Sequence, residues 1–85
     1  MNIKVVGWRG PKTELSILNA QAALSELESE AAVEWISSLD EIMRLGVVHM
    51  PALFINGKLK TSGRIPSVHE ITRLLEEELV QDLAA

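Results

Sequence analysis

The 85-residue chain contains no cysteine. It therefore has no side chain that can form a thiolate, a disulfide, a thiolate metal site or a redox relay. The formal charge is −4 and no Lys/Arg cluster is present, which argues against nucleic acid as a partner because phosphate binding needs grouped positive charge. No apolar run approaches the roughly 20 residues that cross a bilayer. Residues 1–6 lead straight into a strand pattern rather than a signal peptide, so we expect no membrane association and a cytoplasmic location.

The most informative segment that is present is residues 49–57, His-Met-Pro-Ala-Leu-Phe-Ile-Asn-Gly. Because proline cannot donate to a strand ladder, Pro51 marks the first residue or the edge of a strand. The apolar run 52–55 predicts a short strand buried on both faces, near the middle of a sheet. Asn56-Gly57 predicts a hairpin turn after it. A cis Met50–Pro51 bond would explain a proline at the mouth of a central strand.

The remaining patterns place this strand in a β-α-β-α-β-β-α order. Strands are predicted at 3–6, 31–36, 52–55 and 58–62, and helices from Pro11 to about 27, at 41–45, and after a capping box formed by Ser67 and Glu70. The first two strands flank a helix and should be parallel. The lysines at 58 and 60 fit an edge strand. The chain is thus predicted to be a single α/β domain, residues 1–85, with a four-stranded mixed sheet and helices on both faces.

Two helix faces are predicted from the same patterns. The first helix is expected to bury a broad apolar face made by Leu15, Leu18 and Ala22, with Ile17, Leu24 and Leu27 alongside. In the last helix, the acidic run 76–78 is expected to be solvated.

The order of elements and the Met50-Pro51 pair resemble the thioredoxin fold. More narrowly, the chain resembles the small redox-active disulfide protein family, which are glutaredoxin-sized thioredoxin-like proteins. The likeness extends from Ile3 to about Leu75. Its most specific pieces are residues 3–7 (IKVVG), 46–48 (GVV), 50–57 (MPALFING) and 63–67 (GRIPS).

In that family a Cys-Pro-Lys-Cys type motif opens the first helix, and this chain reads Gly10-Pro11-Lys12-Thr13 there. Gly10 stands in place of the nucleophilic cysteine and Thr13 in place of the resolving one. Dithiol exchange needs a thiolate, so we expect a redox-inactive, cysteine-free member without catalytic residues, metal or cofactor. Engineered removal normally leaves serine or alanine, and Trp8-Arg9 also departs from the family, so we interpret the change as natural.

The resemblance implies that Met50, before the predicted cis-proline, presents its backbone to an extended protein or peptide partner, which adds as a strand. The candidate partner-binding residues are Trp8, Arg9, His49, Met50, Pro51 and Arg64. Trp, Met and Arg are enriched at interfaces.

Simpler roles remain open for these residues. Trp8 covers the sheet end or contacts a partner, His49 is a satisfied loop residue, and Thr13 packs within the first helical turn. Gly10 supplies helix-start geometry, and a free helix N-terminus there attracts an anion. Two other functions also stay open. One is a structural subunit or homodimer that uses a sheet edge and Trp35. The other is a glutathione-dependent activity in which the small thiol supplies the sulfur.

Overall fold

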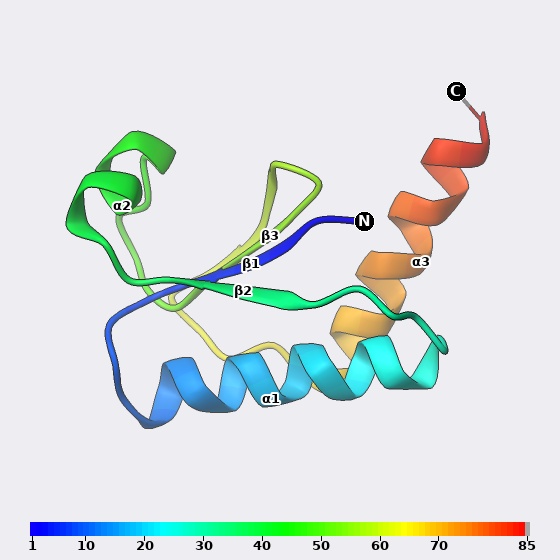
Figure 1. Cartoon of the computed structure of the whole chain (residues 1–85), viewed down its shortest axis with the longest axis horizontal. Coiled ribbons are helices and arrows are strands. Elements are labelled where there is room, and N and C mark those ends of the chain that lie inside the picture. Colours follow the sequence, from blue (N-terminus) through cyan, green and yellow to red (C-terminus); the bar gives the residue numbers. More distant parts are fainter. Residues whose placement is uncertain (85) are drawn as a thin grey trace.

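The computed structural model describes residues 1–84 as one four-stranded sheet with three helices (Figure 1). The elements in chain order are β1 (Ile3–Val6), α1 (Pro11–Glu26), β2 (Val33–Ile36), α2 (Leu39–Leu45), β3 (Ala52–Ile55), β4 (Lys58–Ser62) and α3 (Val68–Ala84). The strand order is β2-β1-β3-β4, with β1 parallel to β2 and antiparallel to β3. The predicted α/β class and mixed sheet are confirmed. No helix within residues 1–84 is long and apolar enough to span a membrane.

The strands follow the local sequence signals closely. β3 is central and buried at all of its residues, as its unbroken apolar run predicts. Asn56 and Gly57 both have positive φ, 52° and 80°, which matches the type I′ hairpin that an Asn-Gly pair favours. β2 begins two residues later than predicted. Its first residue, Val33, pairs with Ile3 at the start of β1, so residues 31 and 32 have no neighbour in the ladder.

The sheet separates two hydrophobic clusters. On one face α1 and α3 pack over alternate residues of the central strands, including Val5 and Leu53, and contribute Leu24 and Ile71. On the other face the short helix α2 covers a smaller cluster. That cluster consists of Val6, Ile36, Ile42, Ala52 and Phe54. Helices therefore lie on both faces, and the side-chain alternation of a strand explains which residues go to which cluster.

The buried face of α1 agrees only in part with the predicted one. Leu24 is buried, and Ile17 and Leu27 pack against the core, as predicted, whereas Ala22 is exposed. Leu15 and Leu18 are 45% and 60% exposed. The fully buried positions of α1 are Thr13, Ser16, Ala20, Ala23 and Leu24. All of these except Leu24 are small residues, which let the helix lie close to the sheet and to α3. The prediction was wrong for Leu15, Leu18 and Ala22 because α1 carries two apolar stripes, and periodicity alone does not say which stripe meets the core.

Helix α3 corrects a second prediction. The Ser67 hydroxyl accepts a hydrogen bond from the Glu70 N–H at 3.1 Å, as a capping box requires. The Glu70 carboxylate, however, binds Arg64 instead of returning to the helix start. Glu78, expected in a solvated run, is only 1% exposed. It lies between Lys58 and Lys60 of β4, with Nζ–carboxylate distances of 3.3 and 2.6 Å, so the helix faces the hairpin there.

Candidate functional site

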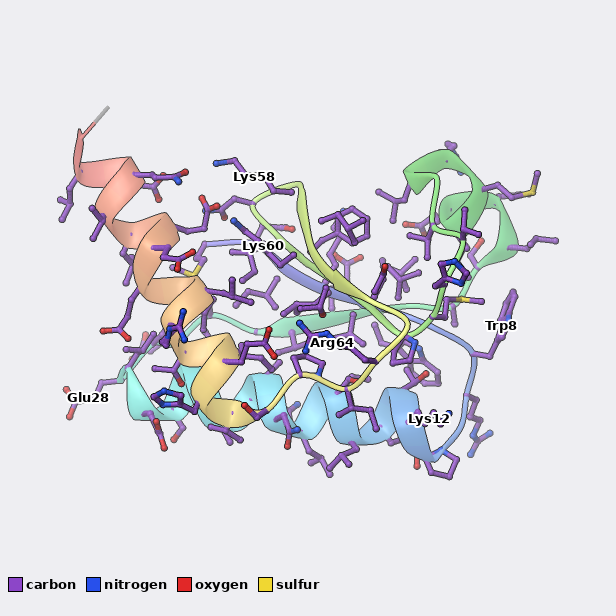
Figure 2. All side chains as sticks on the ribbon, turned by 180° about the vertical axis from the view of Figure 1, so that it is seen from behind. Trp8, Lys12, Glu28, Lys58, Lys60 and Arg64 are labelled. Atoms are coloured by element: carbon purple, nitrogen blue, oxygen red, sulfur yellow. The ribbon has the colours of Figure 1, made fainter. Side chains whose placement is uncertain are left out.

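A groove of about 400 Å³ lies where the N-terminus of α1 meets the chain that enters β3. Its lining residues are Trp8, Gly10, Pro11, Lys12, Thr13, Met50 and Pro51. Figure 2 shows Trp8 and Lys12 at this end of the molecule and Glu28 at the opposite end. The groove thus brings together the two segments that the sequence singled out, residues 10–13 and 50–51.

The loop after β1 forms one wall of the groove. Pro11 occupies the first turn of α1, where its missing N–H costs nothing, and Gly10 is the N-cap. Trp8 is half exposed. The loop is anchored by β2, because the Gly7 N–H donates to the Ile36 carbonyl at 3.0 Å and the Trp35 Nε1–H donates to the Gly7 carbonyl at 2.9 Å.

From the sequence, Trp35 was considered only as part of a sheet edge that could serve a homodimer, and this anchoring role was not predicted. Trp35 pairs with Val5 in the parallel ladder. Its ring therefore lies within reach of Gly7, which is two residues after Val5 and directly follows β1. Only the β1–β2 register reveals this, and a single sequence does not specify that register.

The opposite wall of the groove is the Met50–Pro51 pair, whose peptide bond is cis. The Pro51 carbonyl accepts a hydrogen bond from the Gly63 N–H at 3.0 Å, which ties it to the end of β4. The N–H and C=O of Met50 have no hydrogen-bond partner within residues 1–84. Main-chain groups in folded proteins are nearly always paired with protein or water. Since those of Met50 have no partner in the protein, they offer a donor and an acceptor to a ligand at the groove.

Gly10 and Thr13, which replace the cysteines of the related motif, both line the groove. A side chain on Gly10 would meet no atom within 4 Å. Thr13 is 5% exposed and packs against Gly7, and its hydroxyl makes no hydrogen bond within the described residues. The Gly10 position is therefore open to solvent, and the Thr13 position is occupied by a buried threonine.

Three of the predicted partner-binding residues do not line the groove. Arg9 is exposed in the loop between Trp8 and Gly10. Arg64 forms a forked ion pair with Glu70, with both N–O distances 2.6 Å. Hydrogen bonding in this pair lowers the pKa of the Glu70 carboxyl and raises the pKa of Arg64. His49 lies against Gly63, 3.2 Å from the place of a Cβ on that glycine.

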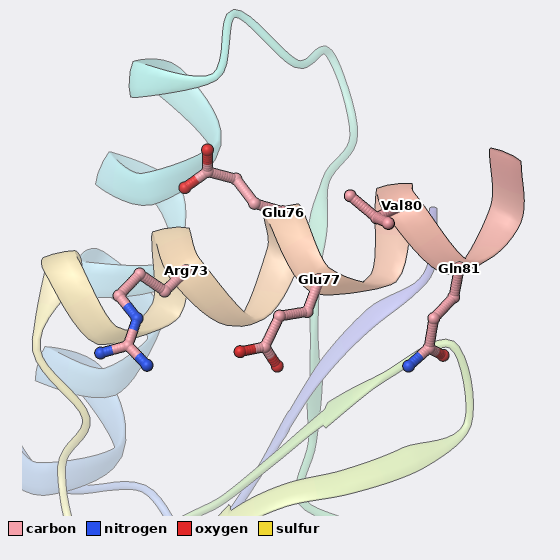
Figure 3. A pocket seen from close by; sticks show the side chains of 5 residues that line it. All are labelled: Arg73, Glu76, Glu77, Val80 and Gln81. Carbon is pink, nitrogen blue, oxygen red and sulfur yellow. The ribbon is translucent and has the colours of Figure 1, made fainter. Parts of the chain in front are cut away.

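A second hollow, of about 540 Å³, runs along the outer surface of α3 (Figure 3). Its lining residues are Arg73, Glu76, Glu77, Val80 and Gln81. All of them come from one helix, and two are acidic. A surface lined by a single helix is shallow, and this hollow lies away from residues 10–13 and 50–51. The groove beside Trp8 and Met50 is therefore the candidate functional site.

The groove offers apolar walls, one ammonium group, one hydroxyl and free main-chain groups. Within residues 1–84 no three His, Asp or Glu side chains gather in a way that would hold a metal ion. The absence of cysteine is consistent with redox inactivity. This inventory suits binding through shape and main-chain hydrogen bonds.

A mixed sheet in the order β2-β1-β3-β4, with the cis Met50–Pro51 pair facing the start of α1, defines a thioredoxin-like protein. The chain belongs to the thioredoxin domain family, whose model matches residues 1–76. It is also 33% identical, over 75 residues, to a protein named thioredoxin from Methanothermobacter thermautotrophicus. That match covers 88% of this chain and 97% of the relative.

Proposed function

We propose that this protein is a redox-inactive thioredoxin-like module that binds an extended segment of a partner protein in the groove beside Met50 and Pro51. The observation that carries the proposal is the unpaired backbone of Met50 at the edge of an apolar groove. An extended peptide can supply the missing acceptor and donor by strand addition.

The walls of the groove support the same proposal. Trp8 is half exposed although it is a large apolar side chain, and Met50 and Pro11 line the same hollow. Tryptophan and methionine are enriched where proteins contact partners, and Trp anchors often dominate the binding free energy. The bond from Trp35 to the Gly7 carbonyl holds the neighbouring loop in place. A preorganised wall lowers the entropic cost of binding.

Selection of random octapeptides displayed on phage against the immobilised protein tests the proposal. Selected peptides are synthesised, and their affinity is measured by calorimetry for the wild type and for Trp8→Ala. Loss of the tryptophan wall is expected to weaken binding at least tenfold, which corresponds to about 1.4 kcal/mol. Methylation of the peptide nitrogen that pairs with Met50 should weaken binding to a similar extent.

The matched control is Leu59→Ala on β4. Leu59 is 53% exposed and lies outside the groove, against 50% for Trp8. Its loss should leave peptide affinity unchanged. Failure to select any peptide, or equal affinity for Trp8→Ala and the wild type, would overturn the proposal.

The redox-inactive part of the proposal has its own test. Reduction of insulin disulfides is followed with dithiothreitol as electron donor, and again with glutathione. No rate above the protein-free reaction is expected with either donor, because the chain supplies no thiolate. A rate above background with glutathione alone would favour the glutathione-dependent alternative.

The homodimer remains the alternative from a different class. β2 is a free edge of the sheet, and Trp35 on it is 41% exposed. An unprotected edge strand is a template for pairing with another chain. However, the indole N–H of Trp35 is already used within its own chain. Size-exclusion chromatography with light scattering distinguishes the homodimer from the peptide-binding monomer. A monomeric mass at all concentrations would exclude the homodimer.

A further inference from the structure

The last turns of α3 expose apolar side chains at the end of the molecule that lies opposite the groove. Leu79, Val80 and Leu83 are 42%, 65% and 87% exposed. Leu83 follows the other two by four and three positions, so the three side chains are neighbours on the helix surface. Figures 1 and 2 both show this part of α3 at the same end of the molecule as the C-terminus of α1. Neighbouring exposed apolar side chains mark interaction surfaces.

This helix face lies outside the part of the chain that the family model describes. The match to the thioredoxin domain model ends at residue 76, and the three apolar residues follow it. The face is also separate from the groove beside Met50, so an inference about it does not depend on the proposed function.

The hollow along α3 has the form that a second helix requires. Its lining residues recur at intervals of three and four positions along one helix, and all of them are exposed. They are Arg73, Glu76, Glu77, Val80 and Gln81. Figure 3 shows these side chains following one another along α3. Residues with this spacing form the ridges and grooves by which helices pack together, so a partner helix can lie along α3.

The same end of the molecule carries negative charge that the chain does not neutralise. Neither α1 nor α3 has a basic residue in its last turn, so the negative ends of two helix dipoles are not offset there. Six exposed carboxylates on α1, on the loop after it and on α3 form no ion pair within residues 1–84. They are Glu26, Glu28, Glu30, Glu76, Glu77 and Asp82.

The basic side chains at the hollow do not balance this charge. Arg73 lines the hollow. Lys58 contacts Gln81, but it is already paired with the buried carboxylate of Glu78. One arginine therefore faces several unpaired carboxylates.

We infer that this face of α3 binds an amphipathic helix of a partner protein, which carries Lys or Arg beside its apolar residues. The apolar side of that helix packs on Leu79, Val80 and Leu83. Its cations lie against the carboxylates of Glu76 and Glu77. Nucleic acid and anionic lipid are repelled by this surface, and a second copy of the chain would bring the same carboxylates together. Charge complementarity therefore selects a basic helix.

Two amphipathic peptides, each about 18 residues long so that they can form a helix, test the charge of the partner. Both carry leucine on the same helical face, and the polar face carries lysine in one peptide and glutamate in the other. Calorimetry should show at least about tenfold tighter binding of the lysine peptide to the wild type. Raising NaCl from about 0.05 M to about 0.3 M should weaken that binding. Equal affinity for the two peptides, or no binding of the lysine peptide, would overturn the inference.

The binding surface is located by the backbone amide chemical shifts of the isotope-labelled protein. Addition of the lysine peptide should change the shifts mainly within residues 73–83. Changes concentrated at residues 8–13 and 50–51 would place the peptide in the groove and contradict the inference. Shifts of residues 73–83 that depend on protein concentration, without peptide, would show that a second copy covers this face and would contradict it as well.

The apolar part of the surface is tested by a double variant that combines Val80→Gln and Leu83→Gln. It should weaken binding of the lysine peptide at least about tenfold. The matched control combines Leu15→Gln and Leu18→Gln, since these leucines are exposed on α1 and do not line the hollow. The control should bind like the wild type, and equal weakening by both double variants would refute the assigned surface.

The charged part is tested by combining Glu76→Gln and Glu77→Gln. Loss of two exposed carboxylates should weaken binding of the lysine peptide about threefold and reduce its dependence on salt. The control combines Asp40→Asn and Glu41→Gln, which removes the same charge from exposed positions of α2. Figure 1 shows α2 at the other end of the molecule. If the control weakens binding as much, only the net charge of the chain attracts the peptide, and the inference fails.

Discussion

At the residue scale, Gly7 and Thr13 are fitted to each other across the junction of β1 and α1. A Cβ atom on Gly7 would overlap the Thr13 Oγ1 atom and lie 3.3 Å from its Cγ2. Thr13 stands where a cysteine stands in the related motif, and a buried threonine has a branched side chain that needs this space. The glycine therefore gives Thr13 room beside the groove.

We predict that Gly7→Ala destabilises the protein by about 1–3 kcal/mol, the usual cost of overpacking a core. In a Thr13→Ala background the two crowding atoms are gone, so the same change should cost at least about 1 kcal/mol less. Urea unfolding of the four proteins in this cycle measures the coupling. Additive effects of the two substitutions would contradict the steric explanation.

Substitution of Ser16 is predicted to increase stability, in contrast to substitution of Gly7. Ser16 is 3% exposed within α1, and its hydroxyl has no hydrogen-bond partner among residues 1–84. Ser16→Ala removes an unpaired buried polar group and raises helix propensity, so it should stabilise the protein by about 0.5–1.5 kcal/mol. The control is Ser25→Ala, an exposed position of α1, which should show only the propensity part, at most about 0.5 kcal/mol. A net loss of stability for Ser16→Ala would show that its hydroxyl has a partner.

At the element scale, the sequence predicted strands better than helix faces. The bounds of β1, β3 and β4 were predicted correctly because each is set by local signals, such as Pro51 before β3 and Asn56-Gly57 after it. The start of β2 depends on where β1 begins, which is a register and not a local property. Helix α2 starts at Leu39, two residues before the predicted start at Glu41, because Ser38 is its N-cap.

Helix α1 allows a direct comparison of its two apolar stripes. Leu24 is 3% exposed in the larger cluster, whereas Leu18 is 60% exposed on the outer side. We predict that Leu24→Ala lowers the free energy of unfolding by about 2–4 kcal/mol, and that Leu18→Ala changes it by less than about 0.5 kcal/mol. Thermal or urea unfolding of the two variants and the wild type measures these changes. Equal losses would mean that the outer stripe is covered in solution.

The candidate site was partly predictable at this same scale. The family resemblance places residues 10–13 and 50–51 together, and the structure brings them to one groove. Arg64 was expected there too. Its guanidinium is instead held by Glu70, and the sequence shows that carboxylate only as half of a capping box. A long charged side chain can pair with any of several groups that come close to it only in the folded chain. The contacts of such side chains are therefore the least predictable part of a site.

At the scale of the whole molecule, one buried carboxylate joins the last helix to the β3–β4 hairpin. Glu78 is 2% exposed at its side chain, and Lys60, 15% exposed, lies 2.6 Å from it. Lys58 contacts both Glu78 and Gln81 one turn later. Figure 2 shows Lys58 and Lys60 on the hairpin beside α3. An acidic run in a sequence is usually solvated, and only the packing of α3 on the sheet turns one of its three members inward.

This arrangement predicts how stability depends on pH. The hydrogen bond from Lys60, and the nearby Lys58, hold the pKa of Glu78 below its ordinary value of 4.5 despite burial. A carboxyl group with a lowered folded-state pKa stabilises the fold fully above its unfolded-state pKa, and this stabilisation is lost as the pH falls through the folded-state value. Wild-type stability should therefore decline as the solution is acidified below about pH 5. Glu78→Gln, which does not titrate, should be less stable than the wild type near neutral pH.

The difference between wild type and Glu78→Gln should shrink on acidification, because the wild-type side chain then becomes neutral as well. Glu70→Gln is the control: the pKa of Glu70 is also lowered, chiefly by its hydrogen bond to Arg64, but that pair is on the surface and contributes little. Urea unfolding at about pH 7 and about pH 3, each with and without about 0.5 M NaCl, separates the two. Salt should reduce the small effect of Glu70 and leave most of the effect of Glu78. A Glu78→Gln difference that stays constant across this range would mean that shape, and not charge, holds α3 against the hairpin.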